Sequence, residues 1–423
     1  MSATPAPDRL AVWTYEEAGE EIPHGDPCVT DAERSAAGRE TITARWQALL
    51  PGNRSRAAAR YAAGGLPDDQ DVMRVWQPRD PAGLRARLTE PPLAVWAEGD
   101  VLHVLWQGQA DEVWLGGGVQ PRLWPVAGTG DLWEASLRIR RLEEAVITVM
   151  AVPRLAGDDA LPRVPDTRVW RGPRAAAVPA GTTAFLGRAF PPLRGTVEDR
   201  TLDSTALGAS RQVTVYRPPG PARTLPACVL ADGEAARGFA WSLESSILAG
   251  AVPPVLVVGV HNASVAARNA RNGPDLRAQE YLPGDNRRRF DAHLRFVAGE
   301  VVPWAGERYG PIDGPWIASG FSNGAGWAIA AAQRRPDVFG AVAGFSAGLV
   351  PQRISRAART ARIRHYLAAG TLEPGFRRAT RQWAERLQRA GLPCRHEEWI
   401  GGHDHLWWEQ QFPVALGWLL APS

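Results

Sequence analysis

Between residues 206 and 423, short apolar runs alternate with helical segments. Most runs lack the polar–apolar alternation of a strand with one face in water, so they are typical of strands covered on both faces. Strands that alternate with helices predict an α/β fold with a doubly wound, mainly parallel sheet. After the alternating strand SRQVTVYRP, the apolar runs are ACVLADG, PPVLVVGVHN, PWIASGFS, VFGAVAGFS and RIRHYLAAG, and the helical segments are GFAWSLESSILAG, RRRFDAHLRFVAGEVVPWAGERYG, AGWAIAAAQRRP and ATRQWAERLQRAG.

A different pattern occupies residues 76–160. Runs such as VLHVLWQG and EVWLGGG alternate with a period of about two between turn signals, which predicts a small antiparallel β-sandwich. Four of the tryptophans in this region either fill the core or form a surface stripe that binds a sugar or an aromatic ligand. Large aromatic residues dominate small cores, which favours packing. The four are Trp106, Trp114, Trp124 and Trp133.

The remaining residues lie before and between these two regions. Residues 1–75 are predicted to be a partly helical extension, with one helix over TDAERSAAGRETITARWQALL and a shorter one over PGNRSRAAARYAAGGLPDDQ. Residues 161–205 are rich in Pro, Gly and Arg, and we interpret them as a linker that partly packs on its neighbours. The predicted order is therefore extension, sandwich, linker and an α/β domain over residues 206–423.

Composition argues against several classes of protein. The net charge is only +3, which does not indicate a nucleic-acid binder, and the run Arg287-Arg288-Arg289 reads as a solvated helix face. The three cysteines are far apart and lack C-x-x-C spacing, which argues against a disulfide framework or a zinc site. Neither a signal peptide nor an apolar run of about 18 residues is present, so we expect a cytoplasmic protein without a membrane segment. The sequence gives no oligomeric state.

The stretch WIASGFSNGAGWAIAAAQRR places Ser322 between Gly320 and Gly324, where a predicted strand turns directly into a predicted helix. Such a turn strains the backbone and brings strand and helix close together, so small residues are needed on both sides of the serine. It exposes the hydroxyl above the strand ends, at a helix N-terminus. A serine hydroxyl needs a base to become a strong nucleophile. The spacing in this context predicts that Ser322 is a catalytic nucleophile.

The base and its acid are expected in loops after later strands, because hydrolases of this kind run in the order serine, acid, histidine. The loop in HEEWIGGHDH offers His403, with His405 as the alternative. Glu373 follows the preceding strand and is the predicted acid, since one helix separates the two loops and both should emerge at the same sheet edge. The H-x-H pair with Asp404 has no further histidine at ligand spacing, so we expect no metal and no cofactor.

An oxyanion that forms during acyl transfer needs preorganised N–H donors. One donor is predicted to be the backbone N–H of Asn323, which follows the nucleophile. The other is assigned to the backbone N–H of Gly233 or Glu234, in the loop after the strand ACVLA.

At these residues the chain resembles the esterase D-type α/β-hydrolases, a group that includes ferric enterobactin esterases and mycolyltransferases. The sandwich pattern LHVLWQGQADEVWLGG…GTGDLWEASL is similar to the N-terminal domain of enterochelin esterases. The resemblance covers about residues 76–423. Its motifs are Leu230-x-Asp232-Gly233, Arg277-x-x-Glu280-Tyr281-x-Pro283, the helix ending in GEVVPWAGERYG, the Gly320-x-Ser322-x-Gly324 turn and Gly401-Gly402-His403-Asp404.

The resemblance implies a serine esterase that hydrolyses a catecholate siderophore and so releases its iron. Iron-loaded catecholates are anionic and arginine suits anionic oxygens, so Arg268 and Arg271 are candidate contacts. Every one of the 48 basic residues is arginine, however, which leaves a bias of the genome as an equal explanation. Trp407 could line the pocket or pack in the core. Arg277 is expected to pair with Glu280 or another carboxylate. The alternatives are an esterase or acyltransferase for another ester, such as an acylated carbohydrate bound by the sandwich, and a binding protein on an inactive scaffold.

Overall fold

The computed structural model describes residues 10–11, 71–75, 80–120, 122–126, 128–155, 166–175, 192–220, 224–263 and 275–422. The chain divides into two compact units. The first unit comprises Met1–Ala176 together with Gly370–Gly375 and Ile400–Asp404, and the second contains the rest. The helices expected within residues 1–75 lie outside the described residues.

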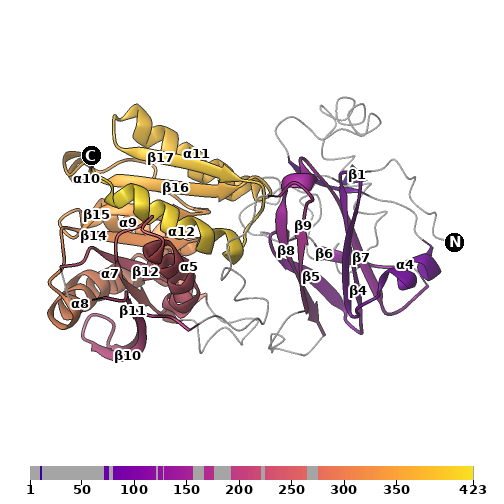
Figure 1. The fold of residues 1–423 in the computed structure, drawn as a ribbon, viewed down its shortest axis with the longest axis horizontal. Coiled ribbons are helices and arrows are strands. Elements are labelled where there is room, and N and C mark those ends of the chain that lie inside the picture. Colours follow the sequence, from indigo (N-terminus) through magenta and orange to yellow (C-terminus); the bar gives the residue numbers. More distant parts are fainter. Residues whose placement is uncertain are drawn as a thin grey trace. The chain divides into compact units, whose positions relative to one another are not determined.

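The first unit is built on an antiparallel sheet (Figure 1). Its strand order is β1-β2-β7-β6-β5-β8-β9, and β3 joins through β4, which pairs with β7. The expected antiparallel domain is therefore present. The elements are β1 (Leu10–Ala11), β2 (Val72–Val75), α4 (Pro81–Arg87), β3 (Leu93–Glu98), β4 (Val101–Gln107), β5 (Glu112–Gly117), β6 (Arg122–Pro125), β7 (Leu132–Ile139), β8 (Val146–Arg154) and β9 (Asp166–Arg171).

Tryptophans take part in the core of this unit. Trp106 and Trp133 belong to one buried cluster with apolar residues of β4, β5, β7 and β8, and Trp124 is also buried. Trp114 is only partly buried, and the Arg154 guanidinium lies 5.8 Å from the centre of its ring. Three of the four tryptophans are therefore packed inside, which removes most of the proposed surface stripe.

The second unit contains an eight-stranded mixed sheet in the order β10-β11-β13-β12-β14-β15-β16-β17. β11 pairs antiparallel with both β10 and β13, while β13, β12, β14, β15 and β16 pair in parallel. The strands are β10 (Thr196–Ser204), β11 (Ala209–Arg217), β12 (Ala227–Ala231), β13 (Leu256–Val260), β14 (Trp316–Phe321), β15 (Phe339–Phe345), β16 (Arg364–Gly370) and β17 (Cys394–Trp399).

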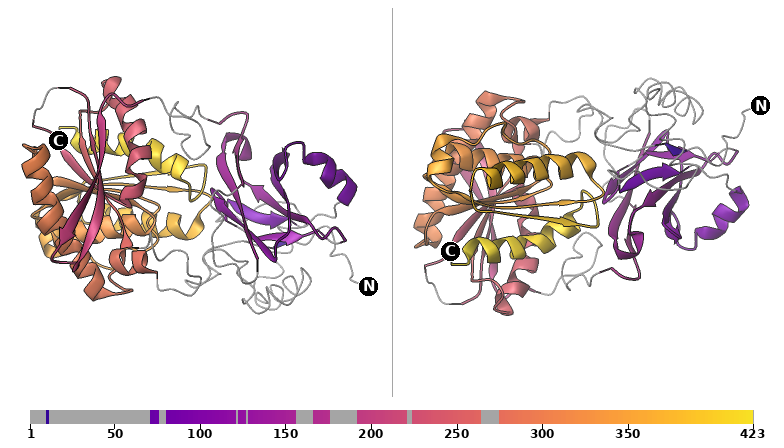
Figure 2. Two further views of the ribbon diagram at one scale, coloured as in Figure 1. Left: turned by 90° about the horizontal axis from the view of Figure 1, so that it is seen from below. Right: turned by 90° about the horizontal axis from the view of Figure 1, so that it is seen from above.

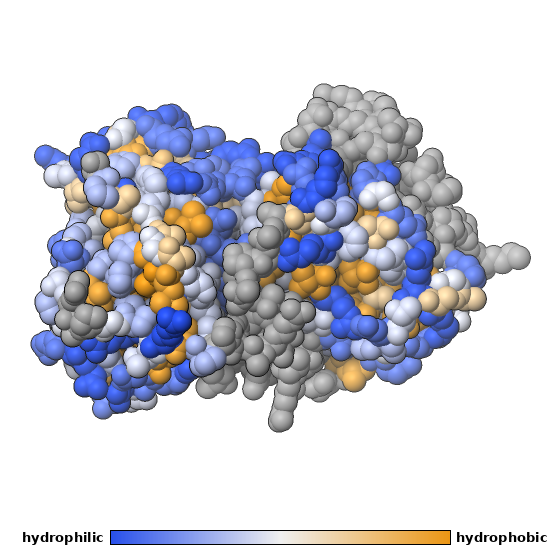
Figure 3. Space-filling model, in the orientation of Figure 1, coloured by the Kyte–Doolittle hydropathy of each residue, from blue (hydrophilic) through white to orange (hydrophobic). Residues whose placement is uncertain are grey.

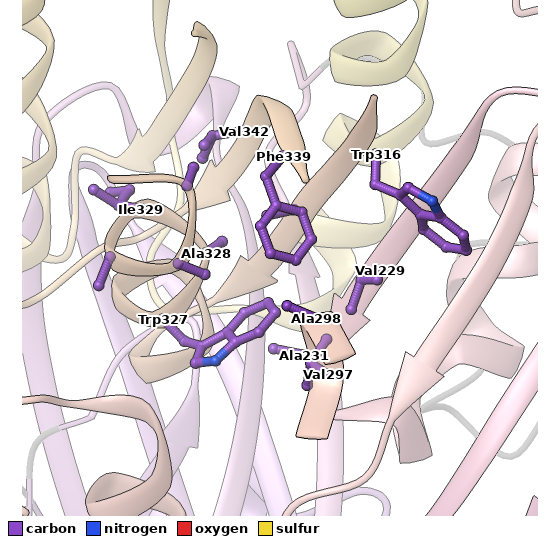
Figure 4. Packing of buried hydrophobic residues seen from close by; sticks show 14 of the residues in the cluster. Val229, Ala231, Val297, Ala298, Trp316, Trp327, Ala328, Ile329, Phe339 and Val342 are labelled. Atoms are coloured by element: carbon purple, nitrogen blue, oxygen red, sulfur yellow. The ribbon is translucent and has the colours of Figure 1, made fainter. Parts of the chain in front are cut away.

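Helices cover this sheet on both faces, as Figure 2 shows. Successive strand residues face opposite cores: Val229 packs with residues of α7, α9 and α11, while Leu230 packs with residues of α5 and α12. On the first of these faces Trp327 of α9 lies against Phe339, with ring centroids 6.1 Å apart (Figure 4). The helices are α5 (Ala236–Leu248), α6 (Leu276–Tyr281), α7 (Arg287–Phe296), the π-helix Val297–Val301, α8 (Val302–Tyr309), α9 (Asn323–Arg334), α10 (Arg356–Thr360), α11 (Pro374–Arg389) and α12 (His405–Leu420).

The boundaries differ from expectation in two regions. Residues 1–75, predicted to be a partly helical extension, contain β1 and β2 of the first sheet. Residues 161–205, interpreted as a linker, contain β9 of the first sheet and β10 of the second. The sequence of β10, TVEDRTLDS, has few apolar residues because most of its side chains face solvent. Nine pairs with β11 hold it in place, so its strand character comes from a partner strand and not from a local apolar pattern.

The described surface in Figure 3 is mainly hydrophilic, and its apolar residues form separate patches. Within the ranges described above, no helix has both the length and the apolar character that crossing a bilayer requires.

Candidate active site

Ser322 occupies the sharp turn between β14 and α9. Its backbone has φ 55° and ψ −127°, a strained conformation for a residue with a side chain, and its N–H donates to the Phe345 carbonyl oxygen over 2.9 Å. A Cβ on Gly320 would overlap the carbonyl group of Gly324, and one on Gly324 would crowd Asp232 Oδ2 at 3.1 Å. The two flanking glycines are thus needed for close approach, as the spacing predicted. The Asn323 N–H lies at the N-terminus of α9, where helix geometry favours negative charge.

The loop after β12 lies next to this turn in the sheet, because β12 pairs with β14. Asp232 there adopts a left-handed conformation (φ 61°), and a 3₁₀ turn follows over Gly233–Ala235. A Cβ on Gly233 would overlap the carbonyl of Gly259, so only glycine fits. The turn leaves the main chain of Gly233 and Glu234 at the carboxyl end of β12, the position expected for an oxyanion donor.

Arg277 of α6 ties this loop to the serine turn. Its guanidinium donates to both Asp232 oxygens, over 2.7 Å and 2.6 Å, and reaches the Phe321 carbonyl at 3.5 Å. Burial lowers the pKa of Arg277, but the Asp232 carboxylate more than compensates, so that the pKa is raised above its ordinary value. A bidentate pair of this kind fixes both orientation and distance.

Glu280 is not the partner of Arg277. Its carboxylate pairs with Arg211 of β11 through two hydrogen bonds of 2.7 Å and 2.8 Å, and it also accepts the Ala263 N–H. The sequence left the partner of Arg277 open between Glu280 and another carboxylate. The structure shows that the partner is Asp232. Burial raises the pKa of Glu280, and the Arg211 hydrogen bonds reverse this, leaving the pKa lowered.

Two further residues, neither of them predicted to have a role, support the loop after β12. The Asp232 N–H donates to the Tyr281 hydroxyl oxygen over 2.8 Å. The Asn262 side chain donates to Asp232 Oδ1 and to Glu234 Oε1, both over 2.8 Å. Tyr281 is inside the R-x-x-E-Y motif. Asn262 is the second residue after the buried strand β13, so a polar residue close to a strand end was the available signal.

The predicted acid and base meet in the first unit. His403 Nδ1 lies 2.7 Å from Glu373 Oε2, and the other carboxylate oxygen accepts the Gly370 N–H over 2.6 Å. Glu373 is fully buried and follows β16, while His403 follows β17. Because an ionised carboxylate only accepts hydrogen bonds, this contact puts a proton on Nδ1 and leaves Nε2 as the acceptor.

The other two aromatic candidates pack against neighbours in the second unit. His405 begins α12 and meets the Phe321 and Trp408 rings at centroid distances of 4.6 Å and 4.7 Å. Trp407 stacks on Trp399 at 5.8 Å. The contact with Glu373 therefore belongs to His403 and not to His405.

A cavity of about 600 Å³ opens where β13 ends and β11 begins, at the same sheet edge as the serine turn. Three exposed arginines of α7 line it, and no described carboxylate pairs with them: Arg288, Arg289 and Arg295. Arg268 and Arg271, the predicted anion contacts, lie outside the described residues. In the part of the chain that the structure describes, no three His, Cys, Asp or Glu side chains gather as a metal site would require.

Comparisons with known proteins agree with this architecture. The enterochelin esterase from Shigella flexneri has a TM-score of 0.56 and 17% identity, covering 81% of this chain and 98% of that chain. The ferric enterobactin esterase from Salmonella typhimurium has a TM-score of 0.55 and 17% identity, covering 80% and 98%. No curated protein sequence matched.

A family model described as putative esterase matches residues 204–419, which is 216 of 423 residues (419 − 204 + 1) and more than half of the chain. The predicted resemblance is confirmed: the chain belongs to the putative esterase family.

Proposed function

We propose that the protein is a serine carboxylic-ester hydrolase of the α/β-hydrolase type, with Ser322 as nucleophile, His403 as base and Glu373 as acid. The observation that carries the proposal is the His403–Glu373 contact of 2.7 Å, which leaves Nε2 ready to accept a proton. Ser322 follows β14 and His403 follows β17 of one sheet. The three residues also follow one another in the chain order serine, acid, histidine that hydrolases of this kind use.

The proposed reaction proceeds by acyl transfer. His403 Nε2 takes the hydroxyl proton as Ser322 Oγ attacks the ester carbonyl, and Glu373 stabilises the imidazolium that forms. The N–H groups of Asn323 and of Gly233 or Glu234 hold the developing oxyanion. His403 then protonates the departing alcohol. A water molecule that His403 deprotonates attacks the acyl-enzyme, which releases the acid and restores the serine. These steps require no cofactor.

For the substrate we propose an anionic ester, specifically a catecholate siderophore whose iron is released on hydrolysis. The arginine-lined cavity at the serine edge supports an anionic ligand, since guanidinium groups bind charged oxygens well. One structural neighbour was crystallised in the presence of enterobactin, at 18% identity. The acylated carbohydrate stays as the second candidate, although three buried tryptophans weaken the case for sugar binding by the first unit.

The test is hydrolysis of ferric enterobactin beside a short-chain nitrophenyl ester by wild type, Ser322→Ala and Glu373→Gln. We expect wild type to cleave both esters and Ser322→Ala to cleave neither. Glu373→Gln is expected to lower kcat by about 10⁴-fold, as loss of the acid does in related triads. Cleavage of the nitrophenyl ester alone would keep the mechanism and contradict the siderophore assignment. Undiminished turnover by Ser322→Ala would contradict the nucleophile.

A further inference from the structure

The loops that carry Glu373 and His403 fold with the antiparallel unit and not with the sheet from which they emerge. Gly370–Gly375 and Ile400–Asp404 both belong to the first unit. Leu372 is part of its buried core with Val113 and Ile147, and Ile400 packs against that core. The loops are also joined to each other, because the Leu372 N–H donates to the Gly401 carbonyl over 2.9 Å.

Asp404, the residue directly after His403, is bonded to strand β8. Its side chain is buried, at 3% exposure for the residue, and Oδ2 accepts the Thr148 N–H over 2.9 Å. On the same edge of β8, the Thr148 carbonyl accepts the Gly118 N–H over 2.7 Å, as in an antiparallel ladder. The carboxylate thus takes the place that a strand partner fills in a continuous β5–β8 pair.

Glycines make this arrangement sterically feasible. A Cβ on Gly402 would overlap the carbonyl oxygen of Gly118, so the two main chains are in direct contact. A Cβ on Gly118 would lie 3.2 Å from Asp404 Oδ2 and 3.0 Å from Ile147. The neighbours of His403 are therefore held on both sides, Gly402 by contact with the Gly118 main chain and Asp404 through its carboxylate, in addition to the contact of the His403 ring with Glu373.

We infer that Asp404 is the positioning residue through which β8 fixes His403. The inference rests on the proposed function of His403 as base. A base must lie within hydrogen-bond reach of the nucleophile, and a displacement of about 1 Å can cost about 100-fold in rate. Loosening the Asp404–Thr148 bond should therefore lower kcat and leave KM almost unchanged, because the bond touches no substrate.

The experiment compares Asp404→Ala, Asp404→Asn and Asp404→Glu in the full chain. We expect Asp404→Ala to lower kcat by about 10- to 100-fold without changing KM. Asp404→Asn should keep most of the activity, since its amide oxygen still accepts the Thr148 N–H. Asp404→Glu keeps the charge but adds a methylene group that displaces the loop, so kcat should fall about tenfold even if the alanine variant does not fold. Asp80→Ala is the control, because Asp80 accepts two backbone N–H groups at α4 of the same unit and is far from these loops in sequence.

Hydrogen exchange at the Thr148 amide separates this inference from the proposed function. We expect exchange at least tenfold faster in Asp404→Ala than in wild type. Unchanged exchange would overturn the anchor, whatever the enzyme hydrolyses. Faster exchange with an unchanged kcat, or a rise in KM alone, would overturn the positioning role. If wild type neither cleaves an ester nor reacts with a serine-directed fluorophosphonate, the proposed function fails, and the Thr148 exchange still decides whether Asp404 holds the loop.

Discussion

A buried histidine in the second unit gives a quantitative prediction about stability and pH. His293 of α7 is 1% exposed, and the rings of Tyr281, Phe296 and Trp327 surround it. Neither of its ring nitrogens has a hydrogen-bond partner among the described residues. Burial lowers the pKa of His293 from 6.5 to about 4, with Glu280 and Asp232 opposing and Arg211 reinforcing the change.

The direction of the pH effect follows from this lowered pKa. Below pH 6.5 the unfolded chain binds a proton at His293, whereas His293 in the folded protein binds this proton only near pH 4. The free energy of unfolding therefore falls as the pH is lowered through this window. Each pKa unit is worth about 1.4 kcal/mol, so the full loss is about 3 kcal/mol, and about 2 kcal/mol of it has occurred at pH 5. That is a large part of the 5–15 kcal/mol typical of a folded domain.

The assay is urea unfolding at pH 7 and at pH 5, followed by tryptophan fluorescence, for wild type and His293→Leu. The wild type should lose about 2 kcal/mol more than the variant between the two pH values. Phe296→Leu is the control, since it loosens the same helix without removing a titratable group. It should lower stability equally at both pH values, and the transition that it shifts identifies unfolding of the second unit. Equal losses in wild type and His293→Leu would refute the reasoning.

Two substitution pairs test the packing around Ser322. Gly320→Ala should destabilise the second unit by about 3 kcal/mol or more, because the new methyl group overlaps the Gly324 carbonyl; Gly306→Ala in α8 meets nothing within 4 Å and should stabilise by roughly 0.5–1 kcal/mol. Thermal unfolding measures both, and equal melting temperatures would contradict the steric argument. Arg277→Gln should cost about 3–5 kcal/mol in urea unfolding, because it leaves the buried Asp232 carboxylate without its cation. Adding Asp232→Asn to Arg277→Gln should recover part of that loss. A cost of Arg277→Gln below about 1 kcal/mol would mean that the Arg277–Asp232 pair behaves like a solvent-exposed ion pair.

The sequence was sufficient to predict structure where the residues that determine it are close together in the chain. The strand, the turn and the helix around Ser322 are consecutive in the chain, and glycines at fixed spacing report their close approach directly. The five apolar runs became buried strands for the same reason, since each is a short continuous apolar run with its own bounding turns. Chain order and one intervening helix were also enough to predict Glu373 and the loop that carries His403 and His405.

Tertiary structure decided the pairings between residues far apart in the sequence. The sequence left His405 open beside His403, and the contact of Glu373 with His403 distinguishes them. Arg277 had several carboxylates within reach along the chain, and only the folded protein brings Asp232 to it. β10 has no apolar pattern of its own and exists because β11 pairs with it.

The bond between Asp404 and Thr148 joins residues 256 positions apart. No local pattern encodes it, because it depends on where β5 stops pairing with β8 and on two glycines that let the chains touch. The sequence by itself therefore determined the buried parallel strands of the second unit, their order and the residue types proposed for catalysis, since these follow from short-range periodicity and turn chemistry. Only the tertiary structure decided which unit holds the base, because long-range contacts are selected by packing of the whole chain.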